Sequence, residues 1–319
     1  MQAFQVTTIG SPPSLTTIST PTPQSHQVRV AIKACGLNFA DLLMVKGQYQ
    51  ETPAAPFTLG MEVAGIIDAV GDQVSDWAVG DRVVVFGGSG GLAEFGVFDA
   101  KNCISLPDTV SFEQGAALLV AYGTSELALN HRAALQPGET LLVLGAAGGV
   151  GLTAVELGKK MGAKVIACAR GSDKLVVAKN AGADHLIDSD SEDITARVKD
   201  LGGADVVYDP VGGAQFTAAL KATKRHGRYL VIGFASGDIA PVPANIILVK
   251  NIAVLGFYWG GYLSTAPVPL ADSLKRVLNW AGASQIHPHV GHTVPLANAA
   301  EGLELLASRR STGKVVVTP

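Results

Sequence analysis

The chain has little cysteine, little charge and no long apolar run. Its 319 residues include three cysteines, Cys35, Cys103 and Cys168, an odd number spread widely along the sequence. This distribution argues against a disulfide framework and is typical of a reducing, cytoplasmic compartment. No stretch approaches about 18 consecutive apolar residues, so we expect no membrane span. The first ten residues, MQAFQVTTIG, also lack the basic-then-apolar layout of a signal peptide.

Charged residues make up 16% of the chain and the formal net charge is −3. No block of Lys or Arg stands out, so we expect neither nucleic acid nor an anionic membrane surface as a partner. Hydrophobic residues make up 48%, which indicates a well-buried globular protein and not a disordered one. The length is typical of two domains.

The two ends of the chain predict one mostly β domain. The first third contains short alternating apolar runs, interrupted by glycine and proline, such as VRVAIKACG, VAGIIDAVG and GDRVVVFGG. The tail adds two helical segments, LADSLKRVLNWAG and LANAAEGLELLASRR, and a final strand, GKVVVTP. We expect the tail to return to the first domain, which would then comprise residues 1–115 and 264–319.

Residues 116–263 predict an inserted α/β domain. The segment 141–144 reads as a short buried strand, followed by a helix to about Met161 and a second strand over 164–169. Four further apolar runs, HLIDS, DVVYDP, RYLVIGF and IAVLGFYW, bring the number of predicted strands to six, with mostly helical segments between them. Continuous apolar strands joined by helices are typical of a doubly wound parallel sheet that is covered on both faces.

A glycine-rich turn follows the first strand of this domain. In LGAAGGVGL, Gly145, Gly148 and Gly151 recur every third residue, directly after a strand and at the start of a helix. Small residues let the backbone approach a pyrophosphate, and the helix N-terminus supplies N–H groups. The alternative is a tight strand–helix turn without a ligand. The residues predicted to bind a dinucleotide here are Gly145, Ala147, Gly148, Gly149, Val150 and Gly151.

The end of the second strand predicts which dinucleotide binds. NAD sites usually place an acidic residue about 20 positions after the glycine turn, where it binds the ribose 2′-hydroxyl. Here the strand ends in Arg170, followed by Ser172 and Lys174, which together suit a 2′-phosphate. We therefore predict NADPH, and expect Asp173 to begin the next helix. The alternative is that Arg170 and Lys174 form a solvated edge.

These features resemble the medium-chain dehydrogenase/reductase superfamily and, within it, the zinc-free quinone oxidoreductases of the zeta-crystallin-like branch. The resemblance runs nearly end to end and implies a GroES-like, mostly β catalytic domain together with a Rossmann domain. It is carried by GLNFADLL, GMEVAG, AVGDQVSDWAVGDRV, GAALLVAYGTS, LQPGETLLVLGAAGGVGLTAVELGKKMGAKVIA, GADHLID, DVVYDPVGG, GRYLVIGFASG and GKVVV.

The resemblance implies that both zinc sites of the superfamily are absent. Zinc-dependent members carry a catalytic Cys where this chain has Asn38, and a His–Glu pair where it has Met61 and Glu62. Cys103 alone remains where a structural zinc lobe needs four Cys. The Asn38 amide could form hydrogen bonds near the nicotinamide or a carbonyl oxygen of the acceptor. Alternatively, Asn38 only suits the turn and bonds its own backbone.

The resemblance implies further site residues. With Asn38, Tyr49 in the substrate cleft and Thr124 near the nicotinamide complete the predicted catalytic set. Relatives carry a Tyr where this chain has Leu43, so one hydroxyl near the nicotinamide is lost. The alternative for the aromatic residues, Trp259 above all, is edge-strand or dimer packing. The residues expected at the cofactor after the fifth and sixth strands are Gly233, Phe234, Phe257 and Trp259.

Three other features allow two interpretations each. The histidines of IHPHVGH could bind a metal, but the segment lacks a convincing third ligand, so we predict no metal site. Glu62 could act as a general base or pair with a buried Arg or with backbone. Lys314 could lie near the cofactor or simply precede a strand.

The predicted reaction follows from the missing zinc. Without a Lewis acid, nothing ionises an alcohol for oxidation. Hydride transfer from NADPH to an electron-poor acceptor depends less on such activation. We expect a quinone or another conjugated carbonyl as the acceptor. The alternatives are a 2-alkenal or enoyl-thioester double-bond reductase, and a non-enzymatic NADPH-binding structural or regulatory protein. Superfamily habit implies a homodimer that pairs its sixth strands through IAVLGFYW.

Overall fold

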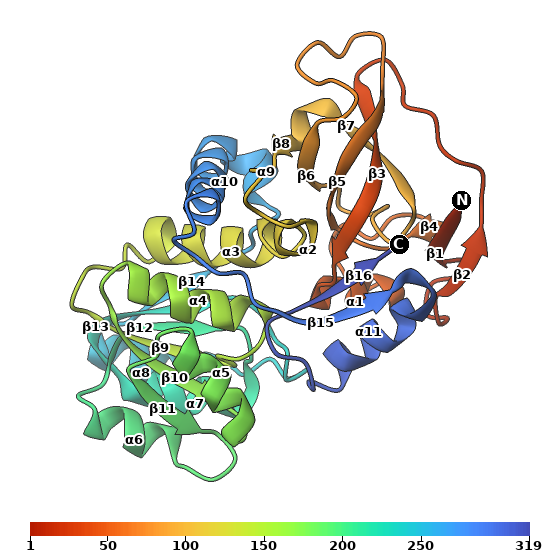
Figure 1. The fold of residues 1–319 in the computed structure, drawn as a ribbon. Coiled ribbons are helices and arrows are strands. Elements are labelled where there is room, and N and C mark those ends of the chain that lie inside the picture. The colour runs from red at the N-terminus through yellow and green to blue at the C-terminus, as the bar shows by residue number, and fades with distance from the viewer. The chain divides into compact units, whose positions relative to one another are not determined.

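The computed structural model describes residues 1–319, which divide into two compact units (Figure 1). The first unit comprises Met1–Val120 and Leu278–Pro319, and the second comprises Ala121–Val277. The predicted boundaries, after residues 115 and 263, lie earlier in the chain. Residues 264–277 belong to the second unit, where Arg276 on α10 (Pro267–Gly282) donates hydrogen bonds of 2.7 and 3.1 Å to the buried carboxylate of Glu126.

The first unit is mostly β, which confirms the prediction for this part of the chain. Its larger sheet has the order β15-β16-β3-β5-β6-β8, with β7 paired to β3, and its smaller sheet has the order β2-β1-β4. The elements of this unit are β1 (Gln2–Val6), β2 (Ser14–Thr17), β3 (Gln27–Gly36), α1 (Phe39–Val45), β4 (Phe57–Thr58), β5 (Glu62–Val70), β6 (Arg82–Phe86), β7 (Phe95–Asp99), η1 (Ala100–Asn102), β8 (Cys103–Ser105), α2 (Phe112–Gly115), β15 (Val290–Pro295), η3 (Leu296–Asn298), α11 (Ala299–Ala307) and β16 (Lys314–Thr318).

The core of the first unit follows from the alternation in β3. Val28, Val30 and Ile32 point to one face and are buried in a cluster with residues of β5, β6 and β16. Cys35 belongs to the same cluster, and the chain then turns into α1. The last strand of the chain returns to this sheet, because β16 pairs antiparallel with the end of β3. The sequence did not predict β15, whose half-exposed residues lack an apolar pattern.

The second unit is a six-stranded parallel sheet with the order β11-β10-β9-β12-β13-β14, which confirms the doubly wound prediction. The chain proceeds outward from β9 in one direction and then from β12 in the other, so the topological switch point lies between β9 and β12. The elements are α3 (Leu119–Glu126), η2 (Leu127–Arg132), β9 (Thr140–Leu144), α4 (Gly149–Lys160), β10 (Lys164–Ala169), α5 (Ser172–Asn180), β11 (His185–Asp188), α6 (Ile194–Asp200), β12 (Ala204–Asp209), α7 (Gly213–Ala222), β13 (Thr223–Val231), α8 (Ala244–Lys250), β14 (Ala253–Gly256), α9 (Tyr262–Thr265) and α10.

Both faces of this sheet are covered, which explains its continuous apolar strands. All five residues of β9 are buried. Leu141 lies under α4, because a Cβ added to Gly158 of that helix would come within 2.5 Å of the Leu141 side chain. Leu142 and Leu144 point to the opposite face and pack in a cluster with residues of α6 and α7, such as Val198.

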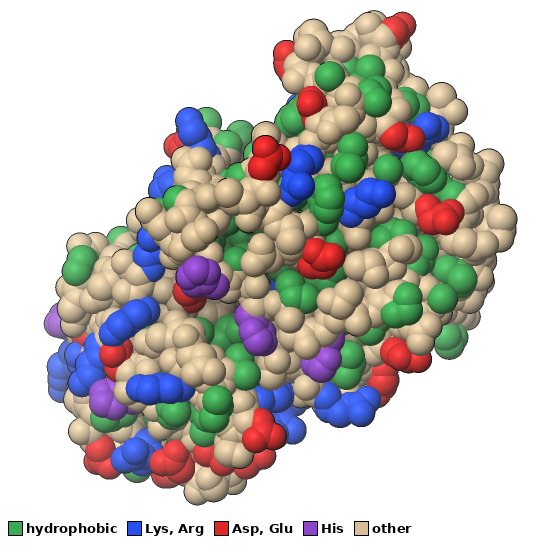
Figure 2. Space-filling view, in the orientation of Figure 1, with side chains coloured by type: hydrophobic (Ala, Val, Ile, Leu, Met, Phe, Trp, Pro, Cys, Tyr) green, Lys and Arg blue, Asp and Glu red, His purple; other side chains and the backbone are tan.

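The surface is mixed in charge. On the face drawn in Figure 2, Lys and Arg side chains are interspersed with Asp and Glu. None of the helices combines the length and the apolar character needed to cross a membrane.

Candidate functional site

The glycine turn between β9 and α4 is built by two glycines that the protein itself requires. Gly145 has a φ of +57°, and a Cβ there would lie 2.9 Å from Cγ2 of Val211. A Cβ on Gly151 would lie 2.2 Å from the carbonyl oxygen of Gly145. Both positions therefore need glycine for the turn to close, whether or not a ligand binds.

Gly148 differs from these two glycines. It is the N-cap of α4, with a φ of −80° that any residue can adopt, and the atom nearest to an added Cβ would be 3.4 Å away. Nothing in the protein therefore requires glycine at this position. The first N–H groups of α4, from Gly149 onward, have no partner within the helix. A small residue beside such N–H groups, at the switch point of a parallel sheet, fits a dinucleotide pyrophosphate.

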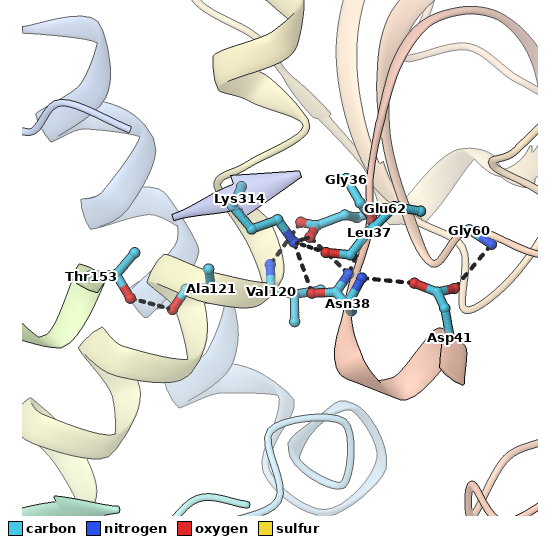
Figure 3. Close-up of polar contacts among 10 residues, drawn as sticks. All are labelled: Gly36, Leu37, Asn38, Asp41, Gly60, Glu62, Val120, Ala121, Thr153 and Lys314. Carbon is cyan, nitrogen blue, oxygen red and sulfur yellow. Dashed lines mark hydrogen bonds and ion pairs between the residues drawn. The ribbon is translucent and has the colours of Figure 1, made fainter. Parts of the chain in front are cut away.

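A network of buried hydroxyl groups holds the first turn of α4 in place. Ser125 Oγ donates to the carbonyl oxygen of Val150 at 2.9 Å and lies 2.9 Å from the hydroxyl of Tyr208. Thr153 Oγ1 lies 2.8 Å from Ser125 Oγ. It also donates to the carbonyl oxygen of Ala121 at 3.1 Å (Figure 3). The network lies beside Thr124, which is itself buried. The sequence analysis missed it, because the hydroxyls come from three separate elements.

Asp209, at the end of β12, organises the neighbouring loop. One carboxylate oxygen accepts from the N–H groups of Val211 and Gly212 at 2.7 and 2.9 Å, and the other accepts from the hydroxyl of Tyr229 at 2.8 Å. Burial raises the pKa of Asp209, although these three bonds oppose the shift. The DPVGG segment indicates a loop at this point of the sequence. Its partner Tyr229 could not be identified from the sequence, because it lies on another strand, β13 (Thr223–Val231).

This loop brings two predicted cofactor segments together. Val211 packs against Gly145 on one side. On the other side, the N–H of Ala235 donates to the carbonyl oxygen of Pro210 at 3.0 Å, which ties down the segment that contains Gly233 and Phe234. Phe234 is 40% exposed, so its ring is accessible to a ligand.

The predicted 2′-phosphate residues lie at the end of β10, among carboxylates. Arg170 Nε lies 3.6 Å from Asp190, and Ser172 Oγ donates to Asp173 at 3.3 Å. Asp173 lies in the first turn of α5, as the sequence predicted. Lys174 belongs to the same turn of α5, so these three residues share one end of the strand.

The two aromatic residues that the sequence predicts at the cofactor after β14, Phe257 and Trp259, are buried. The ring of Phe257 packs in a tilted arrangement against Tyr262, with ring centroids 5.4 Å apart and an interplanar angle of 39°. The indole of Trp259 packs against α3 so closely that a Cβ on Gly123 would lie 2.9 Å from its Nε1. Trp259 therefore contacts the residue next to Thr124, and both residues are part of the core of the second unit.

In the first unit, Asn38 belongs to a buried polar cluster (Figure 3). Its amide nitrogen donates to the carbonyl oxygen of Gly36 at 3.2 Å and to Glu62 Oε1 at 3.0 Å. Its Oδ1 accepts from Lys314 Nζ at 2.8 Å. Both amide hydrogens are thus in use, so Asn38 can offer a ligand only the second lone pair of Oδ1.

Lys314 is the centre of this cluster. Besides Asn38, its ammonium donates to Glu62 Oε1 at 2.6 Å and to the carbonyl oxygen of Leu37 at 2.8 Å, which uses all three of its hydrogens. The Lys314 and Glu62 side chains are 5% and 0% exposed. Glu62 Oε2 accepts from the N–H of Val120 at 2.9 Å. Glu62 is therefore paired with a buried cation and backbone, the non-catalytic alternative, although its partner is Lys and not Arg.

These residues do not fit a zinc site. An ammonium group already lies between Glu62 and Asn38, and the neighbouring Met61 is buried in the hydrophobic core. Elsewhere, His289 shares a hydrogen bond with Thr312 at 3.3 Å. No group of three or more His, Cys, Asp or Glu side chains is arranged to hold a metal ion.

Tyr49 follows α1 in the first unit. Its half-buried side chain packs against the core cluster of that unit, and its carbonyl oxygen accepts from Thr52 Oγ1 at 2.8 Å. The predicted catalytic residues are therefore divided, with Asn38 and Tyr49 in the first unit and Thr124 in the second.

Asp41 completes the polar cluster and makes stability depend on pH. Its carboxylate accepts from the N–H groups of Asn38 at 2.8 Å and Gly60 at 3.2 Å, yet burial raises its pKa to about 6. Because the native state binds this proton more tightly than the unfolded chain, the contribution of Asp41 to stability is full at acidic pH. It is lost as the pH rises through about 6.

We therefore predict that Asp41→Asn flattens the pH dependence of unfolding. Between about pH 4 and pH 7, the free energy of unfolding of the wild type should fall relative to that of the variant, by up to about 3 kcal/mol. Chemical denaturation at a series of pH values measures this difference. The control is Asp72→Asn at an exposed turn, which should follow the wild type. Parallel pH profiles for wild type and Asp41→Asn would contradict the prediction.

Comparison with known proteins supplies the family. The family profile described as "Zinc-binding dehydrogenase" matches residues 149–276, and the "Alcohol dehydrogenase GroES-like domain" matches residues 24–108, which confirms the predicted GroES-like domain. Quinone oxidoreductase-like protein 2 of Bos taurus is 41% identical over 304 residues, covering 94% of this chain and 87% of its own. The synaptic vesicle membrane protein VAT-1 homolog of Homo sapiens is 33% identical over 317 residues, covering 94% and 80%.

Solved structures agree with these relatives. The quinone oxidoreductase from Thermus thermophilus, which was also solved in complex with NADPH, superposes with a TM-score of 0.89 and 34% identity, covering 100% of both chains. The sequence relatives, the two family profiles and this structural match all lead to the same assignment. The chain therefore belongs to the medium-chain dehydrogenase/reductase superfamily, in its quinone oxidoreductase branch.

Proposed function

We propose that this chain is an NADPH-dependent, zinc-independent oxidoreductase that delivers a hydride to a quinone or another conjugated carbonyl acceptor. The observation that carries the proposal is the glycine turn at the switch point, where Gly148 leaves room beside the N–H groups of α4. The NADPH complex of the Thermus relative supports the choice of cofactor. The ammonium of Lys314 between Glu62 and Asn38 supports zinc independence.

The residues of the second unit would hold the cofactor. The pyrophosphate would lie over the turn from Gly145 to Gly151, and Arg170, with Ser172 and Lys174, would bind the 2′-phosphate. The segment with Gly233 and Phe234, held by the Asp209 loop, would face the nicotinamide ring. When bound, NADPH would supply a hydride, which together with a proton from water or a hydroxyl reduces a quinone to its hydroquinone.

Asn38, Tyr49 and Thr124 remain our proposed catalytic set. Since Gly36 and Glu62 occupy the amide hydrogens of Asn38, we propose that Asn38 acts as a hydrogen-bond acceptor through Oδ1 and not as a donor to a carbonyl. The fixed orientation of this amide would position its ligand without the cost of ordering a free side chain. Cytoplasmic location is likewise a proposal, supported by three buried free cysteines.

We also propose a homodimer formed at β14. This strand is the edge of the parallel sheet, and Ala253 and Gly256 at its ends are exposed. Apolar side chains of the preceding α8 are exposed as well, with Leu248 at 76% and Val249 at 58%. An edge strand beside such a surface is a site for pairing with a second copy. Analytical ultracentrifugation should give twice the mass of one chain, and a monomer at micromolar concentration would contradict the dimer.

Oxidation of NADPH by metal-stripped protein tests the proposed activity. Benzoquinone, phenanthrenequinone, a 2-alkenal and crotonyl-CoA are offered in parallel, with NADH as the control cofactor. Turnover with the quinones and NADPH well above NADH is expected. Preference for the alkenal or the thioester would favour double-bond reduction instead. Tight NADPH binding without turnover would favour a non-enzymatic NADPH-binding protein.

A further inference from the structure

A carboxylate that the sequence analysis did not foresee lies near the predicted 2′-phosphate site at the end of β10. Arg170 and Asp190 are both exposed, and Arg170 Nε lies 3.6 Å from Asp190 Oδ1. An acidic residue near this strand end is the feature by which NAD sites accept the ribose 2′-hydroxyl, and an Arg is the feature that accommodates a 2′-phosphate. This chain has both features, because Asp190 faces Arg170.

The position of Asp190 is set by the backbone and not by chance contact. Asp188, at the end of β11, pairs in register with Ala169 of β10. Its carboxylate accepts from the N–H groups of Gly171 at 3.0 Å and Asp190 at 3.1 Å, which ties the loop after β11 to the loop after β10. These hydrogen bonds lower the pKa of Asp188, so its carboxylate is ionised at neutral pH and holds the two loops together.

We infer that Asp190 sets the preference between NADPH and NADH by competing with the 2′-phosphate for Arg170. A phosphate that binds Arg170 must displace the Asp190 carboxylate and bear its repulsion, whereas an unphosphorylated ribose can donate its 2′-hydroxyl to that carboxylate. Asp190 therefore weakens NADPH binding and favours NADH. This inference rests on the proposed function, in which Arg170 meets the ribose end of the cofactor.

Two fragments of the cofactors separate the effect of Asp190 from catalysis. Isothermal titration of the intact protein with 2′,5′-ADP and with 5′-ADP, at equal ionic strength, measures the contribution of the 2′-phosphate directly. For Asp190→Asn we expect 2′,5′-ADP to bind about three- to five-fold more tightly, as for loss of an exposed ion pair, and 5′-ADP to bind equally or more weakly. The gain should shrink as salt is added, because these charges are exposed.

The control variant is Asp200→Asn, which removes an equal charge at the exposed end of α6 and should leave both affinities unchanged. Arg170→Gln should bind both nucleotides with similar affinity. If the wild type prefers 2′,5′-ADP, two results for Asp190→Asn would overturn the role of Asp190 while leaving the NADPH proposal intact. These are an equal gain in affinity for both nucleotides, and no change in either affinity. A wild type that does not prefer 2′,5′-ADP, or binds neither nucleotide, would overturn the NADPH proposal and this inference together.

Discussion

Replacing Lys314 by methionine is expected to lower the free energy of unfolding by about 3–5 kcal/mol. The substitution removes the ammonium that donates to Glu62, to Asn38 and to the carbonyl oxygen of Leu37. The Glu62 carboxylate is fully buried and would lose its countercharge, which is far more costly than the loss of a surface ion pair. Denaturant unfolding of both proteins at neutral pH measures the difference.

A second variant separates the unpaired charge from lost packing. In the double variant Glu62→Gln with Lys314→Met, no charge is left on either member of the pair, and the glutamine oxygen can still accept from the N–H of Val120. We expect the double variant to recover most of the stability lost by Lys314→Met, so that the two substitutions are strongly non-additive. A single variant within about 1 kcal/mol of the wild type would show that the pair contributes little to stability.

Two glycine substitutions in the same turn are expected to give different combinations of stability and cofactor binding. Gly151→Ala places a Cβ 2.2 Å from the carbonyl oxygen of Gly145, so the turn must open. We expect this variant to lose about 1–3 kcal/mol of stability, as in overpacked cores, and to bind NADPH at least about ten-fold more weakly. Gly148→Ala meets nothing closer than 3.4 Å at a φ of −80°, so its stability should change by less than about 1 kcal/mol.

NADPH affinity decides whether the turn is a cofactor site. If the pyrophosphate lies over Gly148, the added methyl group blocks its approach, and Gly148→Ala should also bind NADPH at least about ten-fold more weakly. Fluorescence titration with NADPH, alongside thermal unfolding, gives both quantities for each variant. A stable Gly148→Ala that binds NADPH as the wild type does would remove this turn from the cofactor site.

The order of elements was predictable because it depends on local patterns. The parallel strands of the second unit are short apolar runs separated by helical segments, and β10 coincides with the predicted range 164–169. The glycine turn was predictable for the same reason, since a strand, three glycines and a helix adjoin in sequence. The break of the helical region after residue 112 into α2, α3 and the π-helical η2 was not predictable, since its apolar residues keep a helical spacing throughout.

The partners of the polar side chains were not predictable. Lys314 and Glu62 are 252 residues apart, and the sequence left open whether Lys314 meets a cofactor and whether Glu62 acts as a base. Asp190 could not be related to Arg170 before the pairing of β10 with β11 was known. In each case the local sequence specifies a side chain's chemistry, but not the side chain that faces it across a sheet.

The amino-acid sequence alone was sufficient for the fold class, the family and the glycine turn, because hydrophobic periodicity and backbone requirements act over a few neighbouring residues. The tertiary structure alone shows that the Asn38 amide is held by a buried ion pair and that Arg170 faces a carboxylate. Hydrogen bonds and charges act across a few ångströms of space, and only the folded chain brings these distant residues within that range.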